Sequence, residues 1–567
     1  MIGNESYILP AALNKQLTDA VADWGNHNKV RRLWQRDASL WTNSDEGQWL
    51  GWLDIVEKQM ADLSKFQQFS EEVQKDKFSD VLLLGMGGSS LCPEVLAKTY
   101  GQIDGFPRLH VLDSTDPQQV KAFEDAVNLE RTLFIVSSKS GSTLEPNIFK
   151  KYFFERTKEI VGPSKAGSRW IAITDPGSKL QEEAQADNFR YIFHGVPSIG
   201  GRYSALSNFG IVPAAAMGVS VSKFLAHAQT MVQACTADVA SNPGVMLGLI
   251  LGSAAKRGHD KLTIVASPAI YDLGAWLEQL IAESTGKQGK GIIPVDREEL
   301  TGPEGYGKDR IFAYLRFDPA PDSNQDEHLA ALEKAGHPVI RISLKDTYDL
   351  SQEFFRWEIA TAVAGSVIAI NAFNQPDVEA SKIETRKLTN EYEQSGSLPP
   401  ERPIFEQAGI KLFADPDNAS AVNRGNLAGH VKAHLDRIQP GDYFAVLGYI
   451  QMNREHEARL QEIRHAVRDA KQVATCLGFG PRFLHSTGQA YKGGPNKGVF
   501  LQITCDDAHD LPVPGAKYTF GIVKAAQARG DFQVLADRKR RALRVHLGKD
   551  VEVGLSEMLD IVAEALM

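Results

Sequence analysis

The sequence has few cysteines, no long apolar run and no excess of positive charge. Its four cysteines lie far apart in 567 residues, so no disulfide framework or metal-binding spacing is evident and a reducing compartment is expected. No apolar stretch reaches the ~18 residues that span a bilayer, and the N-terminus lacks the basic and apolar regions of a signal peptide. The net charge of −9 argues against a nucleic-acid-binding surface. These absences predict a cytoplasmic protein with no membrane or nucleic-acid partner.

What the sequence contains is typical of a multidomain α/β protein. Residues 1–75 are polar with a helical pattern, and tryptophans such as Trp24 and Trp52 are expected to anchor their packing. From residue 76, apolar runs such as "VLLLG" and "TLFIVSS" alternate with amphipathic stretches, which is typical of parallel strands covered by helices. A long apolar helix is expected over 354–372, and "SGSLPPERP" at 395–403 is a predicted linker. We therefore predict units at 1–75, 76–235, 236–395 and 396–567.

The tail, residues 396–567, contains an apparent repeat of the preceding unit. The segment "DYFAVLGYI" at 442–450 resembles "RIFAYLRFD" at 310–318, and the segment from Gly498 resembles the one from His337. Each copy has a strand, an acidic turn, "DL" and an Ala-rich helix. The second copy carries an insertion, "RFLHSTGQAYKGGPNKG". Chance similarity between α/β units is the alternative interpretation.

Two loops after predicted strands combine glycines with hydroxyl side chains. "LLLGMGGSS" ends in Gly88, Ser89 and Ser90, and "SSKSGSTLE" at 137–145 follows the apolar run "TLFIV". Glycine lets backbone amides approach a ligand closely, and a helix beginning near Leu144 would point free amides into the second loop. Either loop alone is also typical of an ordinary polar turn. Two such loops in one α/β region favour a phosphate-binding site.

Three further motifs contain candidate catalytic residues. "SIGGRYSALS" places Arg202, whose guanidinium suits oxyanions, after two glycines. "AWLEQLIAESTGK" is an amphipathic helix with Glu283 in its last turn, where the helix dipole disfavours a carboxylate. A role for Glu283 as an active-site base would explain why the chain tolerates this unfavourable electrostatic position. "NQPDVEASK" begins a helix at Pro376 that places Gln375 and Lys382 about two turns apart on a similar face. Each residue also has an ordinary surface interpretation.

Taken together, and in this order, the five motifs resemble the glucose-6-phosphate isomerase family, whose members contain two sugar isomerase (SIS) domains. The resemblance covers about residues 80–385. "LWTNSDEGQWLGWL" and "FLHSTGQAYKGGPN" are further similar to the isomerase half of bifunctional transaldolase/glucose-6-phosphate isomerases, although no transaldolase barrel is predicted here. The implied fold class is α/β, with two SIS-type doubly wound parallel-sheet domains, an N-terminal helical segment and a C-terminal α/β extension.

The resemblance implies reversible isomerisation of D-glucose 6-phosphate and D-fructose 6-phosphate through ring opening and a cis-enediol, without a metal or organic cofactor. It implies that Glu283 moves the proton, that Arg202 faces the reacting carbons and that Lys382 assists ring opening. A non-catalytic phosphosugar sensor and an isomerase accepting mannose 6-phosphate are the alternatives. The implied substrate-binding residues are Gly88, Ser89, Ser138, Lys139, Ser140, Thr143, Glu145, Gly201 and Gln375.

The ring-opening histidine departs from the family pattern. Single-function relatives supply it from the unit just before the last helix of the second SIS domain, and they share it across a dimer. Here that unit contains His328 and His337 but no "HxxGG"-like turn. We therefore expect His485, in the tail's insertion, to open the ring, with a histidine of the second SIS domain as the alternative. Because the tail could supply the histidine in cis or block the dimer interface, monomer and homodimer both stay open.

Overall fold

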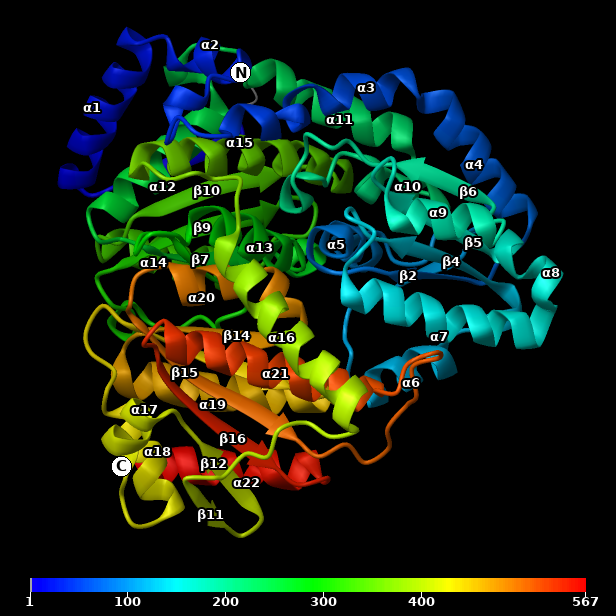
Figure 1. Ribbon diagram of the computed structural model, residues 1–567. Coiled ribbons are helices and arrows are strands. Elements are labelled where there is room, and N and C mark those ends of the chain that lie inside the picture. The colour runs from blue at the N-terminus through cyan, green and yellow to red at the C-terminus, as the bar shows by residue number, and fades with distance from the viewer. Residues whose placement is uncertain (1–2) are drawn as a thin grey trace.

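The computed structural model describes residues 3–567 as an N-terminal segment and three α/β units, each with its own sheet (Figure 1). The N-terminal segment packs over the first two units. It was expected to be helical, but it also contributes a strand that pairs antiparallel with β10 of the second unit, at Glu5↔Ile342. Its elements are β1 (Glu5–Ile8), α1 (Ala11–Asn26), α2 (Lys29–Trp34), α3 (Ile55–Ala61) and α4 (Leu63–Lys75).

The first unit is a parallel five-stranded sheet in the order β3-β2-β4-β5-β6, and every strand expected from its apolar runs is present. Helices cover both faces, which is why its central strand β4 is buried along its whole length. The elements are β2 (Asp80–Leu84), α5 (Leu91–Tyr100), β3 (Arg108–Leu112), α6 (Pro117–Ala126), β4 (Thr132–Ser137), α7 (Leu144–Val161), α8 (Pro163–Ala166), β5 (Trp170–Thr174), α9 (Lys179–Ala186), β6 (Tyr191–His194), α10 (Asn208–Ala216) and α11 (Val221–Ala234).

The second unit has the sheet order β1-β10-β9-β7-β8, with all pairs parallel except that of β1. The long apolar helix expected over 354–372 is α15, which begins earlier and ends at Ile368, because Ala369 adopts a left-handed conformation with φ 55°. The elements are α12 (Pro243–Lys256), β7 (Lys261–Ala266), α13 (Leu273–Thr285), β8 (Ile293–Val295), β9 (Arg310–Phe317), α14 (Ser323–Lys334), β10 (Val339–Leu344), α15 (Leu350–Ile368) and α16 (Pro376–Ser395).

The tail forms a third sheet in the order β11-β12-β16-β15-β13-β14, in which the last four strands are parallel. The hairpin β11–β12 adds two antiparallel strands to one edge. The elements are β11 (Phe405–Gln407), β12 (Ile410–Phe413), α17 (Pro416–Val422), α18 (Leu427–Leu435), β13 (Tyr443–Tyr449), α19 (Arg454–Lys471), β14 (Ala474–Phe479), α20 (Gly488–Gly493), β15 (Gly498–Cys505), α21 (Phe520–Asp537), β16 (Arg541–Leu547) and α22 (Val551–Leu566).

The three sheets share one strand order, which corrects the predicted repeat. In each unit the chain leaves a central strand (β2, β7 or β13) for a neighbour on one side and then crosses to a strand on the other side (β4, β9 or β15). The strand at 443–449 is therefore the counterpart of β7, whereas sequence similarity had aligned it with β9. The alignment slipped by one strand because buried parallel strands have nearly interchangeable apolar patterns.

Apolar side chains join the three units into one body. A single core runs from Leu13 to Phe373, where α10, α11, α12 and α15 pack between the first two sheets. The tail has a core of its own, from Ile410 to Ala565, and it also buries apolar residues against both other units. In Figure 1, α16 descends from the second unit and lies along α21 of the tail. The tail is therefore docked on the other two units by two separate apolar clusters, one with each unit.

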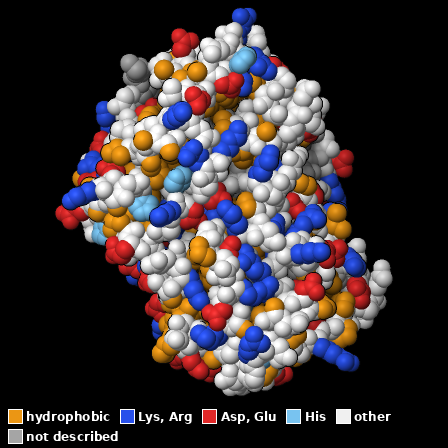
Figure 2. All heavy atoms as spheres, turned by 90° about the vertical axis from the view of Figure 1, so that its left-hand side faces the viewer, with side chains coloured by type: hydrophobic (Ala, Val, Ile, Leu, Met, Phe, Trp, Pro, Cys, Tyr) orange, Lys and Arg blue, Asp and Glu red, His pale blue; other side chains and the backbone are white. Residues whose placement is uncertain are grey.

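The surface and the cysteines agree with the composition. On the face shown in Figure 2, acidic and basic side chains are interspersed, and apolar side chains occur in small groups. In the described chain, Cys92, Cys235, Cys476 and Cys505 are all unbridged. No helix within residues 3–567 is long and apolar enough to cross a bilayer.

Candidate active site

Glycines allow three loops to meet at the carboxyl end of the first sheet. Gly87, after β2, adopts φ 56°, and a Cβ atom there would lie 3.0 Å from the Cβ atom of His485. A Cβ atom on Gly88 would lie 2.0 Å from the carbonyl oxygen of Gly201, which precedes Arg202 in the short helix η7 (Gly201–Tyr203). Larger residues at these positions would separate the loops. The glycines thus bring the β2 loop, the arginine turn and the tail histidine together.

The hydroxyl-rich loop after β4 ends at the N-terminus of α7, which begins at Leu144 as predicted. Thr143 is the N-cap residue, yet its hydroxyl caps no backbone amide and lies 3.4 Å from the hydroxyl of Ser140. Gly141, with φ 66°, turns the chain between them. Ser140 Oγ also accepts from the hydroxyl of Ser142 (3.1 Å), so these hydroxyls contact one another in an exposed loop. Free helix amides and hydroxyl groups are the donors that a phosphate prefers.

Helix α13 presents a carboxylate to a buried arginine. Glu283 lies in its last turn, and its Oε1 is 3.3 Å from Nη1 of Arg202. Arg202 is held by donation to the hydroxyl of Ser284 (2.7 Å), the carbonyl of Ala372 (2.8 Å) and the side chain of Gln375 (3.0 Å). These contacts engage all three guanidinium nitrogens, and Nη1, which donates to Gln375, is also the nitrogen beside the base candidate.

Helix α16 begins at Pro376 as predicted, with Gln375 as its N-cap residue. Gln375 accepts from Arg202, so it lies directly beside the arginine. Two turns on, the ammonium of Lys382 is 2.8 Å from Glu379, and its side chain is 34% exposed. Lys382 is therefore more accessible to solvent than Arg202, whose side chain is 2% exposed.

The tail supplies a histidine to this site in cis. His485 ends the short helix η12 (Arg482–His485), and its Nε2 is 3.0 Å from Oε1 of Glu145 in the first turn of α7. Burial by itself would raise the pKa of the Glu145 carboxyl, but its attraction to His485 and the hydrogen bond between them hold that pKa below its usual value. His485 and Glu145 therefore form a charge-assisted pair that joins the tail to the first unit.

Two glutamines complete the site, and the sequence had not singled out either of them. Gln279, one turn before Glu283, donates to the carboxylate of Glu283 (3.1 Å) and to the carbonyl oxygen of His485 (2.7 Å). Gln527, on α21 of the tail, donates to Glu145 (2.6 Å) and accepts from Thr115 (2.6 Å). The four-residue spacing from Glu283 could have indicated Gln279, but no local pattern points to Gln527.

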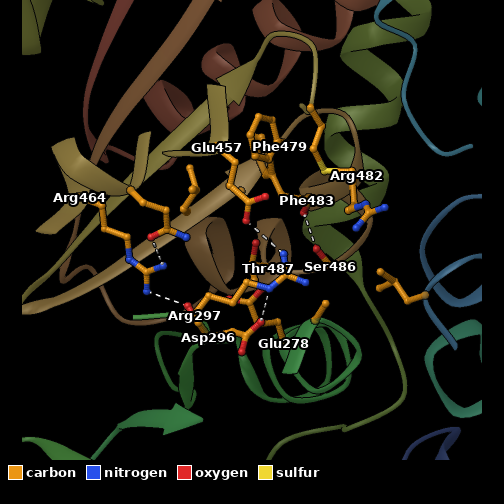
Figure 3. Close-up of a pocket in the computed structure, with 16 residues that line it drawn as sticks. Glu278, Asp296, Arg297, Glu457, Arg464, Phe479, Arg482, Phe483, Ser486 and Thr487 are labelled. Atoms are coloured by element: carbon orange, nitrogen blue, oxygen red, sulfur yellow. Dashed lines mark hydrogen bonds and ion pairs between the residues drawn. The ribbon is translucent and has the colours of Figure 1, made fainter. Parts of the chain in front are cut away.

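An arginine three residues before His485 holds η12 in place. Arg482, whose side chain is 14% exposed, pairs with the buried carboxylates of Glu94 in α5 (2.6 Å) and Asp113 at the end of β3 (2.9 Å). Behind it, Figure 3 shows a small cavity between α13 and the tail where Asp296, Arg297 and further charged side chains meet. The histidine is thus positioned by buried ion pairs and not by a free loop.

These elements enclose a central cavity of about 380 Å³ and an adjacent side cavity of about 250 Å³, which share lining residues such as Lys382 and His485. Glu145 lines only the side cavity, together with Gln527. Ser138 lines neither; its hydroxyl is buried and its amide donates to Ile173 in the sheet (3.0 Å). The expected residues that line the central cavity are Gly88, Ser89, Lys139, Ser140, Thr143, Gly201, Arg202, Glu283, Gln375, Lys382 and His485.

The alternative histidines lie elsewhere. His328 is on the exposed side of α14, with Nδ1 2.8 Å from the carbonyl oxygen of Asn324. His337 packs against Phe312, with ring centroids 5.5 Å apart, and burial lowers its pKa. Neither lines the central cavity or the side cavity. Asp45 and Trp49, from the N-terminal segment, do line the central cavity, although the sequence indicated them only as part of "LWTNSDEGQWLGWL", a stretch that carries the family resemblance, and gave neither a role in the site.

Solved structures resemble this fold. A hypothetical protein from Thermus thermophilus superposes with a TM-score of 0.59 and 23% identity, over 67% of this chain and 99% of that protein. A glucose-6-phosphate isomerase from Chlamydia trachomatis superposes with a TM-score of 0.52 and 21% identity, over 59% of this chain and 73% of that protein. Two doubly wound sheets with a cavity between glycine and hydroxyl loops define the class as the SIS-type phosphosugar isomerase fold.

Sequence comparison finds similarity to one family within that class. The phosphoglucose isomerase family model matches residues 44–307. A probable glucose-6-phosphate isomerase from Methanococcus maripaludis is 28% identical over 59% of this chain and 82% of its own length. A glucose-6-phosphate isomerase from Prochlorococcus marinus (strain NATL2A) is 29% identical over 61% of this chain and 76% of its own length. Over these residues the chain is similar to the glucose-6-phosphate isomerase family.

Proposed function

We propose that the protein interconverts D-glucose 6-phosphate and D-fructose 6-phosphate. The observation that carries this proposal is one cavity in which Glu283, Arg202, Lys382 and His485 face an anion-binding loop. Each of these groups has a separate use in an aldose–ketose isomerisation, and a purely binding protein would need only the loop. The four unbridged cysteines fit a reducing compartment, and a cytoplasmic location is part of the proposal.

In this scheme the phosphate is bound by Ser89, Ser140, Thr143 and the first amides of α7. Binding energy from this remote group orients the sugar carbons over Glu283 and Arg202. His485 bonds to Glu145 through Nε2, and among residues 3–567 its Nδ1 makes no hydrogen bond, so Nδ1 is the nitrogen that meets the sugar. With Lys382 it moves protons at the ring oxygen and the anomeric hydroxyl, which opens the ring.

Glu283 then transfers the proton between the two reacting carbons. The carboxylate removes a proton from one carbon and returns it to the neighbouring carbon through a cis-enediol. Arg202, held rigidly by Ser284 and Ala372, stabilises the negative charge that develops on the enediolate oxygen. Gln279 donates to Glu283 and so keeps the carboxylate aimed into the cavity. Every step is acid–base or electrostatic and uses side chains of this chain.

A coupled assay, with fructose 6-phosphate as substrate and glucose 6-phosphate as the detected product, tests the proposal. Glu283→Gln keeps the side-chain shape and removes the base, so kcat is expected to fall by at least ~10²-fold with a modest change in substrate affinity. Glu299→Gln, on a side chain that is 76% exposed, is the matched control and is expected to be silent. Near-normal turnover in a folded Glu283→Gln protein would contradict the assignment of Glu283 as the catalytic base. A second assay with mannose 6-phosphate measures how strongly the protein discriminates between sugar phosphates that differ in the configuration of one hydroxyl.

A further inference from the structure

The tail contains a cavity at the place where the first unit has its anion loops. It measures about 310 Å³ and is lined by the ends of three parallel strands, at Tyr449, Thr504 and His546. The connections leave β13 and β15 in opposite directions, just as they leave β2 and β4 in the first unit. Ligands of doubly wound sheets bind outside the carboxyl ends of the strands at this switch point. The tail cavity therefore has the topological position of a ligand site.

Two arginines in this cavity share a single carboxylate. Nε of Arg529 lies 2.7 Å from Oε2 of Glu401, and Nη2 of Arg544 lies 2.8 Å from Oε1 of the same side chain. Arg544 is almost fully buried, and its Nε has no hydrogen-bond partner among the described residues. Its guanidinium lies 4.2 Å from the ring centroid of Phe413, which fixes its plane. The pair thus carries one more positive charge than its partner neutralises.

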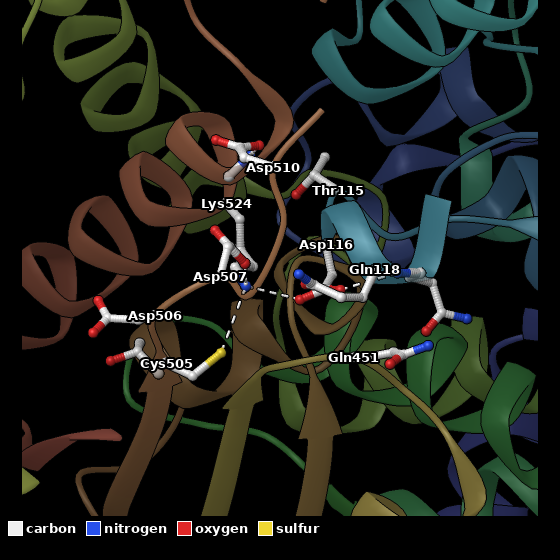
Figure 4. A network of polar contacts seen from close by, with 12 residues as sticks. Thr115, Asp116, Gln118, Gln451, Cys505, Asp506, Asp507, Asp510 and Lys524 are labelled. Carbon is white, nitrogen blue, oxygen red and sulfur yellow. Dashed lines mark hydrogen bonds and ion pairs between the residues drawn. The ribbon is translucent and has the colours of Figure 1, made fainter. Parts of the chain in front are cut away.

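Some of the other buried polar groups of the cavity have hydrogen-bond or ion-pair partners, and others have none. Lys524 is neutralised by Asp116 of the first unit (2.8 Å) and by Asp507, as Figure 4 shows. The hydroxyl of Tyr449, which lines the cavity and is fully buried, has no hydrogen-bond partner within residues 3–567. An unpaired hydroxyl and an unpaired guanidinium N–H are costly to bury unless a ligand satisfies them.

Both polar partners of the arginine pair lie on the linker and outside every helix and strand: the carboxylate of Glu401 and the carbonyl oxygen of Pro399, to which Arg529 donates (2.7 Å). Glu401 is the charged one. It belongs to the linker between α16 and β11, lies between Pro400 and Pro403, and keeps 32% of its side chain exposed. Its two oxygens already occupy the positions that a bound dianion would take across the two guanidinium groups. Planar guanidinium forks recognise carboxylate and phosphate oxygens in this paired way.

We propose that the tail cavity binds a small dianionic metabolite, a phosphate monoester or a dicarboxylate, between Arg529 and Arg544, and that Glu401 is its built-in competitor. The site is separate from the central cavity and does not depend on the isomerase activity. A dianion supplies charge for both arginines, whereas Glu401 supplies one negative charge for two. The competition makes a directional prediction, because removal of the linker carboxylate must strengthen binding.

Calorimetric titration of the full-length protein with inorganic phosphate and, separately, with succinate tests this proposal. Ser140→Ala with Thr143→Ala serves as the background, since it weakens phosphate binding in the central cavity. In that background one molecule is expected to bind per chain, and Glu401→Gln is expected to tighten binding by about tenfold. Arg544→Gln is expected to abolish the tightened binding, and Arg529→Gln, a half-buried position, provides the same test if the Arg544 variant does not fold.

Arg541→Gln is the matched control, because Arg541 lies at the opposite end of β16 and pairs with Asp442 (2.6 Å). It is expected to leave the titration unchanged. Binding of phosphate alone assigns a phosphate ester, binding of succinate alone assigns a dicarboxylate, and binding of both assigns dianions in general. The proposal is overturned if Glu401→Gln tightens neither probe, or if the tightened binding persists in the arginine variants.

Discussion

Among single residues, a chain of hydrogen bonds runs from Thr115 in the first unit through Gln527 in the tail to Glu145 and His485. Gln527 donates to the same oxygen of Glu145 that meets the imidazole. A second donor on a carboxylate stabilises its charged form and limits its rotation. Gln527 therefore acts as a positioning residue, whose amide orients the acid that orients the histidine.

Gln527→Leu removes this donor and keeps a side chain of similar volume. Because the charged form of Glu145 loses a hydrogen bond, the pKa of that carboxyl is expected to rise, so the acid limb of the pH–rate profile should move to higher pH. We expect kcat to fall about tenfold with little change in KM. Gln533→Leu, on an exposed turn of the same helix, is the control. An unchanged pH profile would reduce Gln527 to a packing role.

His485→Asn tests the ring-opening assignment. Without the imidazole, reaction of the cyclic sugar is expected to slow by at least ~10²-fold, the scale of general acid–base catalysis. Proton exchange on substrate supplied in open-chain form should be spared, because Glu283 and Arg202 remain in place. Exchange with labelled water, followed by NMR, separates the two steps. His328→Asn is expected to be silent, and an equal loss in both reactions of His485→Asn would contradict the assignment.

Among the elements, the N-terminus of α7 is the clearest test of phosphate binding. Replacing Ser140 and Thr143 with Ala removes two hydroxyls from the central cavity, so KM should rise while kcat changes little. The rise in melting temperature that inorganic phosphate produces through this cavity should be lost. Ser142→Ala is the control within the same loop, because Ser142 lines only the side cavity. Equal effects of the Ser140/Thr143 double variant and of Ser142→Ala would contradict phosphate binding by this loop and leave it an ordinary polar turn.

The contact between α13, β8 and the tail carries a pH dependence of its own. Burial raises the pKa of Asp296 to about 6 and that of Asp272 to about 7, although Arg297 lies beside both carboxyls. A carboxyl with a raised folded-state pKa binds its proton more tightly in the folded chain. Its contribution to stability is complete below the ordinary pKa near 4 and is lost as pH rises through the folded-state value.

Asp296→Asn should therefore flatten the decline in stability between pH 4.5 and pH 7.5. The side chain stays neutral at every pH, so the part of the decline that belongs to Asp296, up to about 2 kcal/mol across this pH range, disappears. Chemical denaturation at several pH values measures it. Asp469→Asn, on a side chain that is 59% exposed, is the control. A decline of the same size in Asp296→Asn and in the parent chain would show that this carboxyl ionises alike in both states.

In the whole molecule, the tail is held by its interface and not by the linker. Buried pairs such as Lys524–Asp116 and Arg482–Asp113 cross that interface together with apolar contacts. A protease site inserted after Gly396, in the exposed turn that ends α16, should therefore yield two fragments that stay together and remain active after cleavage. Size-exclusion chromatography and the coupled assay measure both. Fragments that separate, with loss of activity, would show that the linker is what holds His485 in place.

The sequence by itself determined the elements and most of the site. Runs such as "TLFIV" could be predicted as strands because a short apolar run that ends in serine and glycine residues is typical of a buried parallel strand, and Pro376 begins a helix because its fixed φ suits the first helical position. The loop residues Ser89, Ser140 and Thr143 could be predicted because the ends of parallel strands meet at one edge of a sheet.

Tertiary structure decided what depends on contacts between distant segments. Nothing local could show that β1 joins the second sheet, that Ser138 turns away from the cavity, or that the tail's strands correspond to β7 and β9. His485 lies 340 residues from its partner Glu145, and Gln527 lies 382 residues from the same carboxylate. Such pairs follow from how the tail docks, and docking depends on the summed shape and charge of whole surfaces, which no short pattern in the sequence encodes.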